Sequence, residues 1–230
     1  MAPAKRAGRD ARRPYHHGDL RRALLDETIA TIRAEGVEGV TLREIGARLG
    51  VSRTALYRHF ADKRALLGAV ATEGFRTLRR QLEAAFEEGG RDDTAFRAMG
   101  VAYVGFAMAN PSHYRVMFGG FVDPPERDAD LAAEAAGAFQ ALVDAIVALQ
   151  GDGVLRADDA ELMARYVWAL VHGMAMLGID GHLREPGAVD ELTRHGFAWL
   201  RTGIAAPSGA AAEVEARGAP GPAPGAPPRV

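Results

Sequence analysis

Two short helical segments joined at a glycine make up residues 41–63, TLREIGARLGVSRTALYRHFADK, and this spacing constrains the chain more than any other feature. Thr41 and Glu44 stand three apart at the predicted start of the first segment, where such a pair forms a capping box for backbone amides left open at a helix start. Apolar residues then recur at helical spacing. Gly50 ends the segment, because glycine adopts the left-handed C-cap conformation without a Cβ clash.

The second predicted segment covers residues 52–60. Ser52 can cap this helix, and Leu56 and Phe60 lie four apart on its apolar face. A helix of this size fits the major groove of DNA, where it presents hydrogen-bonding groups to base edges. The two segments therefore predict a helix-turn-helix motif. Its hydrogen-bonding, cationic and aromatic side chains outside the apolar stripe are Arg53, Thr54, Tyr57, Arg58 and His59.

The same stretch follows the pattern T-x-x-x-I-A/G-x-x-x-G-V-S-x-x-x-L-Y-x-H/Y-F-x-x-K. The residues that match are Thr41, Ile45, Gly46, Gly50, Val51, Ser52, Leu56, Tyr57, His59, Phe60 and Lys63. This pattern resembles the TetR-type (TetR/AcrR-like) transcriptional regulators. Alanine is usual at the position of Gly46, and glycine there still permits close helix packing.

The resemblance implies roles for individual side chains in DNA binding. Candidates for contacts to base edges or the nearby backbone are Arg43, Arg53, Thr54, Tyr57 and Arg58. Candidates for phosphate contacts, which fix register without reading sequence, are Thr41, Tyr57, His59 and Lys63. Ser52 completes the predicted DNA-binding set.

Basic side chains are concentrated in the first third of the chain. Residues 1–80 hold 17 Lys and Arg against 9 Asp and Glu, a formal charge of +8, whereas residues 81–230 hold 11 against 21, a charge of −10. DNA binding requires neutralisation of phosphates, so this distribution predicts that the N-terminal part faces DNA. Arginine supplies 26 of the 28 basic residues, which indicates GC-rich coding and a bacterial source.

Sequence features of catalytic and metal sites are missing. The chain has no cysteine, which excludes disulfides and thiolate metal sites. It has no nucleophile elbow, no phosphate-binding glycine loop and no His/Asp/Glu cluster at metal-ligand spacing. The adjacent histidines His16 and His17 lack carboxylates at ligand spacing. We therefore expect neither an enzyme, nor a metal, nor a cofactor.

We expect a soluble, cytoplasmic protein without a membrane partner. The most apolar run, residues 167–179, is interrupted by His172 and is short for a membrane span. The basic N-terminus lacks the apolar region of a signal peptide.

Helical periodicity without strand-like alternation predicts an all-α fold of about nine helices. Four regions follow from composition: a disordered basic arm (1–18), a three-helix DNA-binding domain (19–61), a helical effector-binding and dimerisation domain (62–205), and a disordered Gly/Pro/Ala tail (206–230). The arm either contacts DNA or is a solvated tail. The predicted helices are 19–35, 42–49, 52–60, 62–88, 94–109, 112–118, 128–149, 159–183 and 189–204.

Two predicted helices near the C-terminus carry more apolar surface than one packed face needs. The helix 159–183 is apolar on two faces, one with Leu162 and Tyr166 and the other with Met163 and Val167. Pairing with a second copy would cover the extra face in an isologous dimer, as the resemblance also implies, and a monomer with a thick core is the alternative. The candidate interface residues are Met163, Val167, Val171, Phe197, Leu200 and Ile204.

A small-molecule effector site is expected among the middle helices, with aromatic and apolar lining. A helical core needs the same residue types, and the few charges among them favour a hydrophobic or amphipathic effector. Trp168, His172 and Gly173 resemble the W-x-x-x-H-G signature of a C-terminal TetR-type subgroup, although His172 also suits a hydrogen-bonded core position. The candidate lining residues are Phe75, Met99, Tyr103, Phe106, Tyr114, Met117, Phe118, Trp168 and His172.

Residues and resemblance together predict a homodimeric repressor that leaves operator DNA when the effector binds. A metabolite-binding helical module without DNA binding is one alternative, but its basic groups should have been lost, and Arg43, Arg53, Arg58 and Lys63 are all present. A TetR-type activator is the other alternative.

Overall fold

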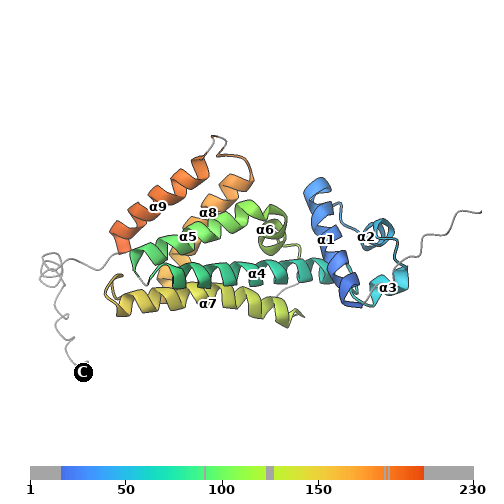
Figure 1. The fold of residues 1–230 in the computed structure, drawn as a ribbon, viewed down its shortest axis with the longest axis horizontal. Coiled ribbons are helices and arrows are strands. Elements are labelled where there is room, and N and C mark those ends of the chain that lie inside the picture. The colour runs from blue at the N-terminus through green and yellow to red at the C-terminus, as the bar shows by residue number, and fades with distance from the viewer. Residues whose placement is uncertain (1–16, 91, 123–126, 184, 186, 205–230) are drawn as a thin grey trace, which may run out of the picture. The chain divides into compact units, whose positions relative to one another are not determined.

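The computed structural model describes residues 17–90, 92–122, 127–183, 185 and 187–204. Their regular secondary structure is α-helical, which confirms the predicted all-α fold (Figure 1). The predicted basic arm and the Gly/Pro/Ala tail lie almost wholly outside the described residues. The helices are α1 (His17–Glu35), α2 (Leu42–Arg48), α3 (Arg53–Tyr57), α4 (Lys63–Glu88), α5 (Asp93–Ala109), α6 (Pro111–Phe118), α7 (Ala129–Gly151), α8 (Ala160–Ile179) and α9 (Ala188–Ile204).

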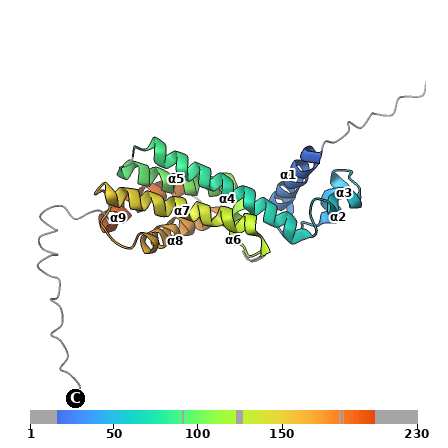
Figure 2. The same ribbon diagram turned by 90° about the horizontal axis from the view of Figure 1, so that it is seen from below.

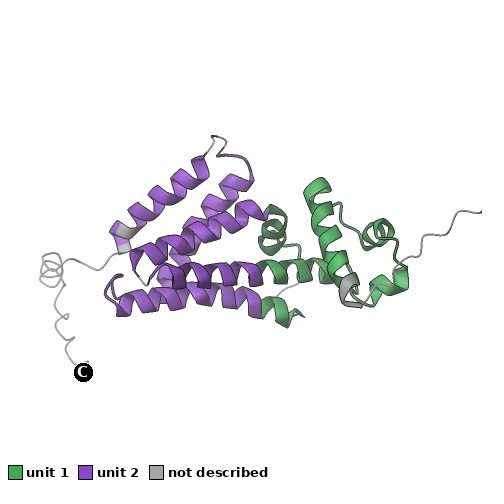
Figure 3. Cartoon of the chain, in the orientation of Figure 1, with its two compact units in different colours: residues 1–74, 111–132 green, residues 75–110, 133–230 purple. Residues whose placement is uncertain are grey.

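The chain forms two compact units, shown in green and purple in Figure 3. Unit 1 comprises residues 1–74 and 111–132, and unit 2 comprises residues 75–110 and 133–230. The predicted division at residue 62 is not the one the compact units follow. The long helix α4 contributes residues to both units, and α6 groups with the N-terminal helices because it contacts α1.

In unit 1, α1 is the central helix, since it contacts both α2 and α6. Leu24 and Thr28 are fully buried on its inner face. The hydroxyl of Thr28 donates to the carbonyl oxygen of Leu24 at 2.7 Å, so this buried polar group is satisfied. Gly36, with φ of +79°, ends the helix as predicted.

In unit 2, α5 packs against both α8 and α9, and α8 contacts α9 (Figures 1 and 2). Gly100 lets α9 approach α5, because a Cβ at this position would overlap the ring of Phe197. The Phe197 ring also meets Phe96 edge-on, with ring centroids 5.8 Å apart. Such a contact adds about 0.5–1.5 kcal/mol to the burial of the two rings.

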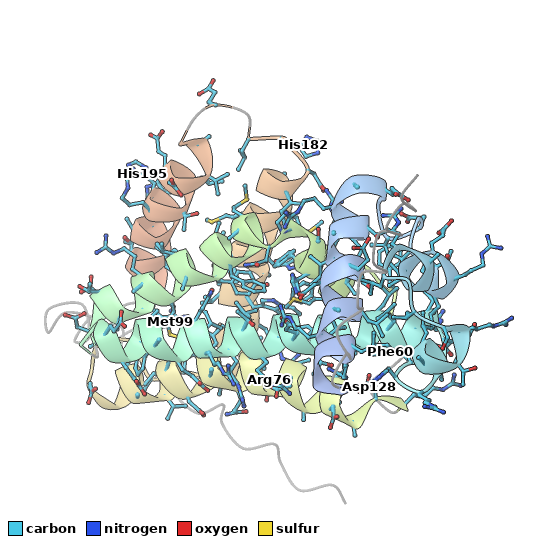
Figure 4. The ribbon with its side chains drawn as sticks, turned by 45° about the vertical axis from the view of Figure 1, so that its right-hand side comes forward. Phe60, Arg76, Met99, Asp128, His182 and His195 are labelled. Atoms are coloured by element: carbon cyan, nitrogen blue, oxygen red, sulfur yellow. The ribbon has the colours of Figure 1, made fainter. Side chains whose placement is uncertain are left out.

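Ion pairs connect α4 with α7 inside unit 2. Arg76, labelled in Figure 4, donates from Nε to Oε1 of Glu134 at 2.8 Å. The Nη2 atom of Arg79 lies 3.4 Å from Oε2 of the same carboxylate. The Glu134 side chain is only 15% exposed, so this cluster is shielded better than a surface ion pair.

The α8 helix ends earlier than predicted, at Ile179 and not near residue 183. Gly181 has φ of +73°, and its amide donates to the carbonyl oxygen of Gly178 at 3.1 Å. The amide of His182 donates to the carbonyl oxygen of Leu177 at 2.9 Å. These bonds form a glycine C-cap that stops the helix despite the apolar residues beyond it.

Candidate nucleic-acid interface and ligand-binding surfaces

The turn between α2 and α3 is a glycine-capped helix end. Gly50 has φ of +64°, in the left-handed region that favours glycine. The amide of Val51 donates to the carbonyl oxygen of Gly46 at 3.0 Å, and that of Gly50 to Ala47 at 3.1 Å. These two bonds form a Schellman motif, which confirms Gly50 as the predicted stop residue. The motif fixes the direction in which α3 leaves α2.

Gly46 lies at the contact between α2 and α3. A Cβ added at Gly46 would lie 2.8 Å from Cδ1 of Leu56, and both residues are buried. Thr41 caps α2 as predicted, since its Oγ1 accepts from the amide of Glu44 at 3.2 Å and donates to the Glu44 carboxylate at 2.8 Å. Both ends of α2 are therefore set by local residues.

The α3 helix is shorter than predicted and spans Arg53–Tyr57, not residues 52–60. Ser52 is its N-cap, and its Oγ accepts from the amide of Ala55 at 3.2 Å. The amides of His59 and Phe60 both donate to the carbonyl oxygen of Leu56, so the backbone closes in a turn. Phe60, labelled in Figure 4, is buried, and the guanidinium of Arg21 lies 5.4 Å from its ring centroid.

Most side chains predicted to bind DNA are exposed on unit 1. His59 and Lys63 are half-buried, and the Lys63 ammonium donates to the carbonyl oxygen of Glu38 at 3.2 Å. Their contacts with DNA stay predictions. The exposed members of the set are Thr41, Arg43, Ser52, Arg53, Thr54, Tyr57 and Arg58.

Some arginines of unit 1 are neutralised by carboxylates of neighbouring helices. Arg22 on α1 pairs with Glu73 on α4 at 2.8 Å. Arg48 on α2 pairs with Glu35 and, at 3.5 Å, with Glu27, both on α1. The hydrogen bond from Arg48 to Glu35 raises the pKa of the guanidinium. These arginines join helices of the unit and are poorly placed to neutralise phosphates.

The arginines around α3 are different. Within the part of the chain that the structure describes, Arg43, Arg53 and Arg58 form no ion pair. The guanidinium of Arg53 lies 5.4 Å from the ring centroid of Tyr57, a cation–π contact that leaves its N–H groups able to donate. Arginine binds phosphate and the O6 and N7 atoms of guanine through its planar fork. The surface at α3 therefore carries positive charge that the carboxylates of the described residues do not pair with.

Unit 2 brings together three residues of the predicted effector site. The indole Nε1 of Trp168 donates to the hydroxyl oxygen of Tyr103 at 3.1 Å, and this oxygen lies 3.4 Å from Nδ1 of His172. Burial lowers the pKa of His172, so its imidazole is neutral near pH 7. Phe139 of α7 meets the Trp168 ring edge-on at 6.1 Å. Polar groups from α5 and α8 thus meet among aromatic rings.

The other predicted effector residues divide between the two units. Phe75, Met99 and Phe106 are buried in unit 2. In unit 1, Tyr114 and Met117 are buried, and the half-buried Phe118 has its ring centroid 4.8 Å from that of Tyr114. The effector role of these six residues stays a prediction.

The residues predicted to form a dimer interface mostly point into unit 2. The side chain of Ile204 lies outside the described set. Met163 and Leu200 nevertheless also line the groove described in the next paragraph. The interface role of the predicted residues, and the dimer itself, stay predictions. Periodicity revealed two apolar faces on α8 and could not tell which one is buried inside the subunit. The buried members of the predicted set are Met163, Val167, Val171, Phe197 and Leu200.

The other faces of α8 and α9 carry large apolar side chains in contact with solvent. Leu162, Tyr166 and Trp199 are 64%, 65% and 71% exposed. They line a groove of about 710 Å³ that also includes Leu170 and Leu192. We call this surface the α8–α9 groove. Large apolar side chains gathered at one exposed place are typical of an interaction surface or a ligand-binding groove.

Two further properties bear on the expected absence of metal and membrane. In the described ranges, His, Asp and Glu side chains do not gather in groups of three that could hold a metal ion. The α7 and α8 helices have the length and hydropathy of membrane spans, with mean hydropathy of 1.5 and 1.4. One or two such helices are weak evidence, because core helices of soluble proteins have the same properties.

Comparison with known proteins found family models that match the N-terminal and the C-terminal part of the chain. Residues 24–70 match the family model described as bacterial regulatory proteins, tetR family. Residues 96–200 match the model described as the tetracyclin repressor-like C-terminal domain. Together the two models cover the helix-turn-helix motif and most of unit 2.

Individual relatives agree with these matches. An HTH-type transcriptional regulator of Mycobacterium tuberculosis is 29% identical over 145 residues, which are 60% of this chain and 57% of that protein's length. The class C tetracycline repressor of Escherichia coli is 45% identical over 51 residues, 22% of this chain and 23% of the repressor. A solved structure of a protein of unknown function from Rhodococcus sp. RHA1 is 34% identical with a TM-score of 0.75, covering 84% of this chain and 100% of that one. The α2–α3 geometry, the two family matches and these relatives show that the chain belongs to the TetR family of bacterial regulatory proteins.

Proposed function

We propose that this protein is a DNA-binding transcriptional regulator that reads its operator with α3. The observation that carries the proposal is the division of arginines in unit 1. Arg22 and Arg48 are paired with carboxylates, whereas Arg43, Arg53 and Arg58 are exposed without an ion pair among the described residues. Arginines of this kind beside an exposed helix can bind DNA phosphates and the edges of guanine bases.

The regulator acts as a homodimer through the α8–α9 groove. Burial of a large apolar side chain contributes about 1.5–3 kcal/mol, so covering Leu162, Tyr166 and Trp199 favours association. A two-fold axis brings the same surface of both copies together. Two α3 helices then bind half-sites about one helical turn of DNA, or a multiple of it, apart.

A small hydrophobic or amphipathic effector releases this dimer from DNA, and the protein works in the cytoplasm as a repressor. The cluster of Tyr103, Trp168 and His172 supports an effector of this class, because it combines neutral hydrogen-bonding groups with aromatic surface. The local similarity to a tetracycline repressor supports the repressor role.

Substitution of Arg53 tests the DNA-binding role. Binding sites are first selected from a random duplex library with the wild-type protein. We expect Arg53→Ala to weaken binding to the selected site by about 5- to 150-fold, since a bidentate arginine–guanine contact contributes about 1–3 kcal/mol of discrimination. Binding to unrelated DNA should fall much less, because a base contact carries specificity.

Two matched variants separate DNA contact from other effects. Arg97→Ala removes an exposed arginine from α5 in unit 2 and should leave binding unchanged. Arg48→Ala removes an arginine that is paired with Glu35 in unit 1, so it should lower thermal stability more than DNA affinity. Equal binding of wild type and Arg53→Ala to the selected site would refute the role of α3.

The wild-type protein and the selected DNA site also test the two alternative functions, a metabolite-binding module and an activator. Failure of the wild-type protein to select any duplex at low salt would favour a metabolite-binding module without DNA binding. Transcription in vitro from a promoter overlapping the selected site distinguishes repressor from activator, with repression expected.

A further inference from the structure

His113 on α6 lies where α6 meets α1 and α4 in unit 1. The helices α1 and α6 are in contact. Gly74 lets α6 approach α4, because a Cβ added there would lie 2.5 Å from Sδ of Met117 and 3.4 Å from Cβ of His113. The neighbours Ser112 and Tyr114 are buried, and His113 itself is half-buried. Its imidazole therefore belongs to a helix contact and has limited access to water.

Charged side chains from both neighbouring helices act on this imidazole: Arg22, Asp26 and Arg33 from α1, and Glu73 from α4. Arg22 already engages both carboxylates. Its Nη1 lies 2.8 Å from Oε1 of Glu73, and its Nη2 lies 2.8 Å from Oδ1 of Asp26. A protonated His113 would add a further cation to a group of charges in which Arg22 already pairs with both carboxylates. The cluster as built suits a neutral histidine.

Burial in this contact lowers the pKa of His113 below its ordinary value of 6.5; Arg22 and Arg33 lower it further, while Glu73 and Asp26 oppose the shift. The unfolded chain keeps the ordinary value, so it binds more protons than the folded chain as the pH falls. The stability that the neutral histidine contributes is therefore present above pH 6.5. It is lost as the pH falls from there towards the pKa of the folded state.

We propose that the contact of α6 with α1 and α4 is an acid-sensitive switch, in which protonation of His113 loosens α6 and lowers the affinity of unit 1 for DNA. The effect on DNA affinity rests on the proposed function, whereas the loosening of α6 does not. Mild acidification would then act on the regulator without any effector. Because one proton is involved, the equilibrium constant for loosening of α6 and that for DNA binding can each change by at most about tenfold per pH unit.

The variant His113→Gln removes the titration and keeps a neutral polar side chain. The matched control is His195→Gln, which replaces an exposed histidine on α9, labelled in Figure 4. For wild type and both variants, the thermal midpoint and the affinity for the selected DNA site are measured between about pH 7.5 and 5.5 at constant ionic strength. As the pH falls, we expect the thermal midpoint of wild type and of His195→Gln to drop more than that of His113→Gln. Their affinity for the selected DNA site should also fall several-fold more. Other histidines titrate alike in wild type and His113→Gln, so their effects cancel in that comparison.

Parallel pH curves for wild type and His113→Gln would overturn the switch. An NMR titration of the full-length wild-type protein gives an answer that does not depend on the variant folding: a His113 pKa at or above 6.5 would also overturn it. Loss of specific DNA binding by all three proteins at pH 7.5 would instead contradict the proposed function. In that case the thermal midpoints and the NMR titration still decide whether the α6 contact is acid-sensitive.

Discussion

The turn between α2 and α3 needs a backbone conformation that glycine adopts at little cost, and Gly50→Ala isolates that need. A Cβ added at Gly50 would meet no atom within 4 Å, so the substitution introduces no clash. The φ of +64° is unfavourable for alanine, at a cost of about 1–2 kcal/mol. Alanine also restricts the unfolded chain, which offsets about 0.4–1 kcal/mol. The expected net destabilisation is about 1 kcal/mol.

The measurement is thermal unfolding followed by circular dichroism. For a chain of this size, about 1 kcal/mol corresponds to a drop in Tm of roughly 2–4 °C, and to more if unit 1 unfolds separately. Gly50→Asn should lose less, because asparagine tolerates the left-handed region. DNA affinity should fall in Gly50→Ala as well, since the same turn sets the direction of α3.

The matched control is Gly105→Ala on α5. This glycine is exposed within a helix, and a Cβ there would also meet no atom within 4 Å. Alanine is favoured over glycine in a helix interior by up to about 1 kcal/mol, so the control should gain stability. The two substitutions add the same methyl group to open space and differ in backbone conformation. A change of Tm in the same direction for both would refute the reasoning.

Two further predictions concern unit 2. Gly100→Ala places a Cβ in the Phe197 ring and should cost about 1–3 kcal/mol or more in thermal unfolding, in contrast to Gly105→Ala on the same helix; an unchanged Tm would contradict the close approach of α9 to α5. Trp199→Ala removes a side chain that is 71% exposed, so it should leave subunit folding intact. Both copies lose the side chain, at about 1.5–3 kcal/mol each, so the dimer should weaken by about 3–6 kcal/mol in sedimentation equilibrium. An unchanged dissociation constant would exclude the α8–α9 groove as the interface.

Local signals in the sequence were sufficient for the DNA-binding motif. Thr41, Gly50 and Ser52 act within their own turns, through capping bonds to residues at most five positions away. Such interactions depend on residue type and spacing, which a sequence displays directly. The end of α3 was misplaced because its last turn closes on Leu56, and a turn of this kind has the same apolar spacing as a helix.

Long-range packing was not predictable in the same way. The sequence contains both apolar faces of α8, but only the fold decides that Met163 and Val167 are buried while Leu162 and Tyr166 remain exposed. The grouping of α6 with α1, and with it the surroundings of His113, also depends on contacts between segments far apart in the chain.

The sequence by itself determined the all-α class and the helix-turn-helix, because helix periodicity, caps and the glycine turn are local properties of the chain. The resemblance of residues 41–63 to the TetR-type pattern indicated the family. The tertiary structure alone decided which arginines are neutralised, which face of α8 and α9 is left uncovered, and which helices enclose His113. The physical reason is that burial and ion pairing depend on which segments meet in space, and neighbouring residues in the sequence do not specify that.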